Sequence, residues 1–159
     1  MSRSGYIDDC YDPLELGRWR GRVASAIRGK RGQQLLRDAL AALDAMPDKR
    51  LVKNFLIFDG YGDPYSDAVI VGADELADSF GNPMPQGGVC LLGAVGRHRN
   101  IDMSNLDPED SESVAGAFDI ADPLAREIVF MNDEAGLFRE SPEARWQRMR
   151  DWVVAHIKP

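Results

Sequence analysis

At four predicted helix starts proline directly follows a helix-capping residue, and this pattern constrains the fold more than any other feature. Asp and Ser side chains accept hydrogen bonds from the unpaired N–H groups of a first helical turn. Proline suits the first helical position, where its missing N–H is not needed. Four of the nine prolines lie in such pairs: Asp12-Pro13, Asp107-Pro108, Asp122-Pro123 and Ser141-Pro142. The pattern predicts a mainly helical protein.

Apolar residues recur at helical spacing after each of these starts and predict a single globular domain over residues 12–159. We expect about six helices: 13–28, 33–45, one after Cys90, and three beginning at 107, 122 and 141. The short link 29–32 predicts that the first two pair antiparallel. The expected core is Trp19, Val23, Ile27, Leu36, Leu40, Leu43, Val114, Phe118, Leu124, Ile128, Trp146, Met149 and Val153.

Residues outside this helical pattern fall into two segments. Residues 1–11 are polar and acidic, which predicts a flexible N-terminal arm. Two short β-favouring runs, 51–58 and 68–71, flank a turn cluster and predict a small inserted β-hairpin. A short acidic helix is expected at 73–80. The predicted fold class is therefore mainly α (α+β), resembling a helical bundle, with an insertion at 54–86.

Charge is divided unevenly along a chain whose net charge is −7. Residues 16–37 contain seven basic residues and no acidic one, whereas 54–96 contain six acidic residues and no basic one. The two runs are either solvated faces that complement each other or surfaces that meet a charged partner. The candidate binding residues are Arg18, Arg22, Arg28, Lys30 and Arg31, and the acidic Asp59, Asp63, Asp67, Asp74, Glu75 and Asp78. The basic set suits nucleic-acid phosphates as well as an acidic protein.

Several classes of function are disfavoured by what the sequence lacks. No apolar run approaches the ~18 residues of a membrane span, and the N-terminus lacks a signal-peptide core, so we expect a cytoplasmic protein. Two histidines and two distant cysteines form no zinc pattern, and the spacing of Asp59, Asp63 and Asp67 does not match a calcium loop. We expect no metal and no cofactor.

Cys90 is the one candidate nucleophile. It follows two glycines and precedes a helix-compatible run, which predicts a cysteine at a helix start, where unpaired N–H groups favour a thiolate. Asn132 and Asp133 are candidate orienting groups, and His98 and His156 are the available bases. The alternative is a small buried residue, since free cysteine is among the most buried types.

Four segments, 17–33, 41–47, 89–97 and 124–134, resemble a family of small bacteriophage and prophage proteins to which no activity is attached. The segment 54–86 departs from that family. A weaker likeness, Cys-x-x-Gly-Ala followed by an Asn-Asp pair after a helix, extends to small bacterial proteins of unknown function. The resemblance implies a phage origin and the cytoplasm of a host cell.

The leading hypothesis is a phage-encoded acidic protein that acts by protein–protein binding on an unidentified host protein, as an inhibitor of a defence or nucleic-acid-handling complex. A cysteine-dependent hydrolase or amidase using Cys90 is the first alternative. It requires a partly exposed thiol of lowered pKa beside an imidazole or carboxylate. A nucleic-acid-associated accessory protein using the basic helix pair at 18–37 is the second.

Overall fold

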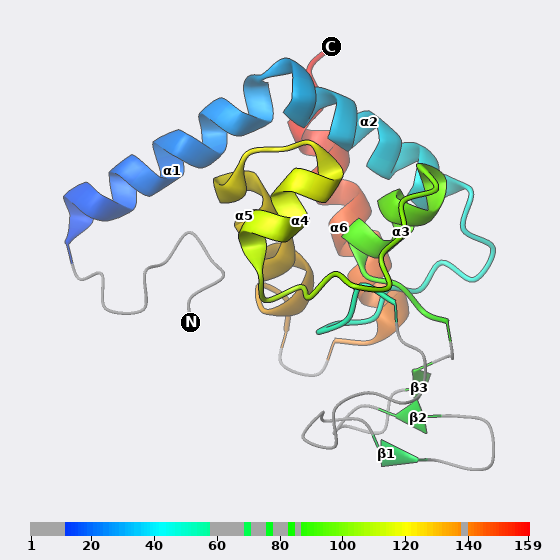
Figure 1. Ribbon diagram of the computed structural model, residues 1–159. Coiled ribbons are helices and arrows are strands. Elements are labelled where there is room, and N and C mark those ends of the chain that lie inside the picture. The colour runs from blue at the N-terminus through cyan, green and yellow to red at the C-terminus, as the bar shows by residue number, and fades with distance from the viewer. Residues whose placement is uncertain (1–11, 58–68, 71–75, 78–82, 85–86, 138–139) are drawn as a thin grey trace.

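Helices dominate the structure, as the capping pattern predicts. The computed structural model describes residues 12–57, 69–70, 76–77, 83–84, 87–137 and 140–159. Among them are six helices: α1 (Pro13–Arg28), α2 (Lys30–Asp44), α3 (Leu91–His98), α4 (Ser111–Phe118), α5 (Asp122–Asp133) and α6 (Pro142–His156) (Figure 1). The prediction of a mainly helical protein is confirmed.

Two of the four predicted helix starts are confirmed. The Asp12 carboxylate accepts a hydrogen bond from the Leu14 N–H at 2.9 Å and caps α1. The Ser141 hydroxyl accepts one from the Ala144 N–H at 3.1 Å and caps α6. In both helices proline occupies the first turn, because its fixed φ already suits a helix.

The other two starts are shifted. Asp107 accepts from the Glu109 N–H within a turn, and α4 begins only at Ser111, capped by Asp110. Asp122 lies inside the first turn of α5, whose N-cap is Ala121. The capping residue and the proline therefore predict the right neighbourhood but not the right residue. At α4 this is because Asp110 takes the capping role in place of Asp107.

The antiparallel pairing predicted for the first two helices is wrong. Only Gly29 interrupts them, and α2 begins at Lys30, three residues before the predicted start. Figure 1 shows α1 and α2 as two arms of an open angle. A Cβ on Gly32 would lie 2.0 Å from the Ala26 carbonyl oxygen, so the backbones on the two sides of this corner touch where glycine alone leaves room.

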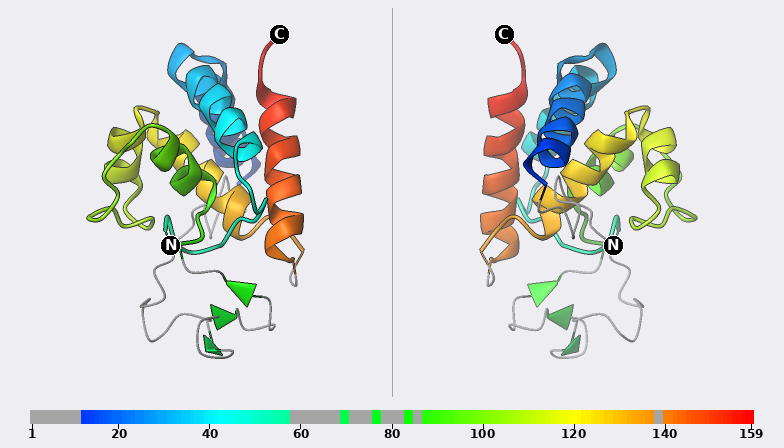
Figure 2. Two further views of the ribbon diagram at one scale, coloured as in Figure 1. Left: turned by 90° about the vertical axis from the view of Figure 1, so that its right-hand side faces the viewer. Right: turned by 90° about the vertical axis from the view of Figure 1, so that its left-hand side faces the viewer.

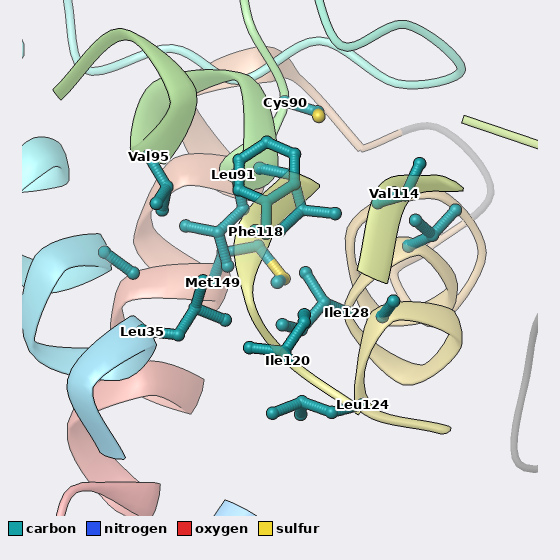
Figure 3. Close-up of a cluster of buried hydrophobic side chains, with 14 of the residues drawn as sticks. Leu35, Cys90, Leu91, Val95, Val114, Phe118, Ile120, Leu124, Ile128 and Met149 are labelled. Carbon is teal, nitrogen blue, oxygen red and sulfur yellow. The ribbon is translucent and has the colours of Figure 1, made fainter. Parts of the chain in front are cut away.

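One apolar core joins all six helices. The helix α2 contacts α3 and α6, α5 contacts α1, α3, α4 and α6, and α6 stands as a column at one side of the molecule (Figure 2). Phe118, Leu124 and Met149 are fully buried in this core (Figure 3). Of the predicted core residues only Leu40 is not buried, and it packs half-buried against the core.

The predicted hairpin is not supported. Val69–Ile70 (β1) pairs with Leu76–Ala77 (β2), which pairs with Pro83–Met84 (β3), all antiparallel. Ile57, expected in the first hairpin strand, instead forms a bridge with Val89. The acidic helix predicted at 73–80 is wrong at Leu76–Ala77, which is a strand. The rest of that helix and the predicted arm at 1–11 lie outside the described residues.

Candidate functional site

Cys90 lies where the sequence predicts, at the N-cap of α3. Its Sγ accepts a hydrogen bond from the Gly93 N–H at 3.4 Å. The side chain is only 7% exposed and belongs to the apolar core. Figure 3 shows it at one edge of the cluster, beyond Leu91. The thiol therefore caps a helix from within the protein.

The lowered pKa that the hydrolase hypothesis requires of Cys90 is not found, whereas the alternative of a small buried residue fits. Burial, and after it the nearby Asp133 carboxylate, raise the pKa of this thiol to about 12. The backbone N–H groups at the start of α3 lower the pKa, as a helix start should, but by less. Near neutral pH Cys90 is therefore a protonated thiol.

Asn132 and Asp133 are brought beside Cys90, as the hydrolase hypothesis requires. All three line a cavity of about 10 Å³ between α3 and α5, which is room for one water molecule at most. Neither described histidine lines it, since His98 is exposed near the end of α3 and His156 lies in α6. Cysteine and carboxylate thus meet without an imidazole and without space for a substrate.

The Asn132 side chain holds chain segments together. Its Oδ1 accepts from the Leu91 N–H at 3.1 Å, and its Nδ2 donates to the Val52 carbonyl at 2.9 Å. The same Nδ2 also donates to Asp133 Oδ1 at 2.8 Å, and this oxygen accepts from the Asn54 N–H at 3.1 Å. The amide therefore joins α5 to the start of α3 and to residues 51–57.

The glycines of α3 serve close packing. A Cβ on Gly93 would lie 1.8 Å from the Leu56 carbonyl oxygen, and one on Gly96 would lie 2.2 Å from the Met103 sulfur. Both positions therefore let other segments touch the helix backbone. The hydrogen-bond partners of Cys90 and Asn132 thus lie within the protein.

The predicted basic residues separate in space. Arg18 pairs with Glu15 at 2.7 Å on α1, and Arg22 is exposed on the same helix. Arg28, Lys30 and Arg31 instead line an open groove of about 690 Å³ beside the α1–α2 corner. The other residues that line this basic groove are Gln33, Gln34, Arg37, Asp38, Arg99 and Asp119.

The basic groove carries a net positive charge in an acidic protein. Five cations and two carboxylates line it, which leaves an excess of three positive charges. Asp38 pairs with Arg99 at 2.7 Å, and Asp119 pairs with Arg31 at 3.1 Å. The other three cations, Arg28, Lys30 and Arg37, are exposed and form no ion pair within the described ranges. An anionic partner can therefore approach them directly.

Three of the five cations, Arg28, Lys30 and Arg31, are predicted binding residues, and the other two, Arg37 and Arg99, are not. Arg37 belonged to the recognised basic run, but its place on the groove depends on α2 continuing from Lys30. Arg99 follows α3 and reaches the groove because α3 packs on α2. No local sequence pattern predicts that Arg99 lies beside Asp38. The acidic candidates Asp59, Asp63, Asp67, Asp74, Glu75 and Asp78 lie outside the described residues.

A second hollow, the apolar cleft, lies on the other side of the corner. It has a volume of about 550 Å³ and is bounded by α1, α5 and the end of α6. In the right-hand view of Figure 2, α1 stands between α6 and the α4–α5 pair. Trp19, Val23 and Ile27 of α1 and Phe130 and Met131 of α5 give it apolar walls. It shares Arg28 and Gln33 with the basic groove.

Within the described ranges, no group of three or more His, Cys, Asp and Glu side chains could hold a metal ion. No helix there is long and apolar enough to span a bilayer. No family model matches this chain, and no curated protein or solved structure gives a significant match. What the protein does must therefore be inferred from its own surface.

Proposed function

We propose that this protein acts by binding an acidic partner protein, and that the basic groove receives this partner. The observation that carries the proposal is the excess of three positive charges in one hollow of a chain whose net charge is −7. Complementary charge steers a partner toward its site and fixes its orientation. The groove is thus the described surface best suited to select an acidic partner.

The start of α2 supports this proposal because its charges oppose helix stability. A helix N-terminus carries a partial positive charge and favours acidic residues. In α2 the first turn instead contains Lys30 and Arg31, has no acidic residue, and lacks a side-chain cap. A cation in this position is disfavoured by the helix itself. The presence of cations at this position is explained if an anionic group of a partner protein binds them.

A protein partner suits the groove better than single-stranded nucleic acid. Proteins that bind single strands combine cations with aromatic platforms on which bases stack. The residues that line the basic groove include five cations but no aromatic side chain. The net charge of −7 also opposes general attraction to phosphate backbones. Nucleic acid therefore becomes an outcome of the test and not the proposal.

The resemblance to phage proteins directs the search for the partner to a bacterial host. Under this proposal the protein occupies a host protein, with a defence or nucleic-acid-handling complex as the first class to examine. The hydrolase alternative receives less support, because Cys90 is buried and the pKa of its thiol is raised to about 12. Binding therefore comes before catalysis in the order of testing.

The test is capture of host proteins from a nuclease-treated bacterial lysate on the immobilised protein. The natural chain is compared with Lys30→Glu, which reverses one charge of the groove, and with Arg22→Glu, which makes the same change on exposed α1. We expect a retained protein that elutes with salt, is weakened by Lys30→Glu and is unaffected by Arg22→Glu. Mass spectrometry identifies it.

Three results would count against the proposal. No retained protein at all removes its basis, and equal loss in both variants means that general charge and not the groove decides binding. Retention from an untreated lysate that is absent from the nuclease-treated one identifies nucleic acid as the partner. A matched retardation assay with labelled duplex and single-stranded DNA at several salt concentrations then measures this second activity.

A further inference from the structure

The apolar cleft has the length of a short helix. Its residues on α1 run from Leu16 to Arg28 at spacings of three and four, so they form one face of that helix. Twelve residues at 1.5 Å each give about 18 Å, or a little over three turns. The opposite wall is formed by α5, and Ala155, His156 and Lys158 bound one end.

The walls of the cleft are apolar and only partly covered. Trp19, Val23 and Ile27 are each 8% exposed, so they are packed against the protein below. Leu16 and Met131 are half-buried and leave apolar surface accessible in the cleft. Burying such surface against a partner is favourable at about 25 cal/mol per Å². The cleft therefore offers a hydrophobic driving force for binding.

The rim of the cleft is cationic. Among the described residues that line the cleft, the three cations Arg20, Arg28 and Lys158 outnumber the one carboxylate, Glu127, by two. Within the described residues, neither Arg20 nor Arg28 forms an ion pair. Apolar walls below a cationic rim fit an occupant that is apolar on one face and acidic at its edges.

The backbone of the occupant must satisfy its own hydrogen bonds. The side chains on the cleft floor are mostly apolar, and α1 and α5 use their backbone groups internally. An extended peptide would leave N–H and C=O groups unpaired there, whereas a helix pairs them within itself. A second copy presenting its own α1 would bring a like-charged surface to the rim. Length, polarity and charge together select an acidic helix.

We infer that the apolar cleft binds an amphipathic helix of about three turns, carried by a partner protein, with acidic residues along the edges of its apolar face. The inference rests on the proposed function, because it gives the acidic partner a second contact across the corner that contains Arg28 and Gln33. One partner then places its helix in the cleft and further acidic residues in the basic groove.

The probe is a labelled 14-residue helical peptide with leucines at positions i, i+4, i+7 and i+11 and glutamates at the edges, measured by fluorescence anisotropy. A scrambled peptide of the same composition and a peptide with lysine in place of glutamate are its controls. We expect binding of the first peptide alone. Arg20→Glu should weaken it about tenfold, and Arg22→Glu, the same change outside the cleft, less than twofold.

A variant that blocks the cleft sterically tests whether the peptide binds there, without removing a charge. Ala155→Trp fills the end of the cleft from an exposed position on α6, and Ala41→Trp adds the same side chain to exposed α2 away from it. We expect loss of peptide binding in the first variant alone, while both unfold thermally like the natural chain. Equal binding by Ala155→Trp would overturn the inference, even if Lys30→Glu still abolishes capture of a host protein and so upholds the proposed function.

A small amphiphile is the competing occupant. Laurate has the same chemistry, an apolar chain and one carboxylate, and is titrated against the labelled peptide. Saturable binding of laurate that Ala155→Trp abolishes, with no binding of any peptide, would assign the cleft to a lipid-like ligand and overturn the helix inference. If neither laurate nor peptide binds, the inference fails while the basic groove is judged by its own assay.

Discussion

The start of α3 and the α1–α2 corner use polar groups in opposite ways. Around α3 the polar groups are buried and paired inside the protein, as Asn132 is with Leu91 and Val52. At the corner Arg28 and Lys30 are exposed, without an ion pair among the described residues. A buried and satisfied network holds a fold together, whereas exposed charges of one sign in a hollow suit an external partner.

The same difference separates the candidate nucleophile, Cys90, from the candidate binding surface. Cys90 occupies a helix start, which usually activates a thiol, but burial outweighs that effect. The start of α2 has a less conspicuous sequence and contains no nucleophile. It nevertheless carries Lys30 and Arg31, whose charges are exposed to solvent. Burial therefore keeps the Cys90 thiol unreactive, whereas the cations at the start of α2 remain exposed to a partner. Each consequence can be tested.

The largest expected effect is on the reactivity of Cys90. A pKa of about 12 against the ordinary 9.0 leaves about a thousandfold less thiolate near neutral pH. In a Cys10→Ser variant we expect the thiol to react with a small disulfide reagent only after denaturant is added. Fast reaction of the folded protein with an apparent pKa below ~8.5 would restore the enzyme hypothesis.

Removing the Asn132 amide should destabilise the protein most. Asn132→Leu leaves the buried Leu91 N–H and Val52 carbonyl without their partner. Each of the two orphaned groups costs about 1–3 kcal/mol, so we expect a loss of about 2–6 kcal/mol in urea unfolding. Asn105→Ala, an exposed control, should change stability by less than ~0.5 kcal/mol. Similar values for the two variants would contradict the structural role of Asn132.

A methyl group at Gly93 should be destabilising, whereas one at Gly116 should not. The Cβ of Gly93→Ala would lie 1.8 Å from the Leu56 carbonyl oxygen, and relieving that clash should cost about 1–3 kcal/mol. Nothing lies within 4 Å of the same atom at Gly116 in α4. Gly116→Ala should therefore stabilise the helix by up to about 1 kcal/mol. Thermal unfolding of both variants measures the contrast.

Charge reversal at the corner should stabilise the fold while it weakens binding. Lys30→Glu replaces a cation by an anion at the positive end of α2, where an acidic residue contributes about 0.3–1 kcal/mol at low salt. We expect a higher midpoint in urea that approaches the natural value in 1 M salt. A destabilised Lys30→Glu variant would mean that Lys30 stabilises the fold. It would then contradict the contrast between the structural polar groups around α3 and the exposed charges of the corner.

The smallest effect concerns the surface pair between Asp44 and Arg150. Their hydrogen bond, 2.6 Å between Oδ1 and Nε, holds the pKa of Asp44 below its ordinary 3.8. A lowered folded pKa contributes stability that is complete above 3.8 and is lost as the pH falls through the folded value. Asp44→Asn should therefore lower stability slightly at pH 6 and leave it unchanged near pH 2. Urea unfolding at both pH values compares them.

Features that depend on neighbouring residues could be predicted from the sequence. The ends of α1 and the cap of α6 follow from local hydrogen bonds, and Trp19, Val23 and Ile27 follow from helical spacing. Cys90 was correctly placed at a helix start for the same reason. The hairpin failed because β pairing depends on distant segments, here the bridge between Ile57 and Val89.

The sequence by itself determined the helical class, most of the core and three cations of the basic groove, because capping and amphipathic spacing act within a few residues. Tertiary structure alone decided that Arg99 completes that groove, that the apolar cleft opens between α1, α5 and α6, and that Cys90 is a protonated thiol. Each of these depends on which segments pack together. Contacts between segments that are distant in the sequence are properties of the packed chain, and no local pattern encodes them.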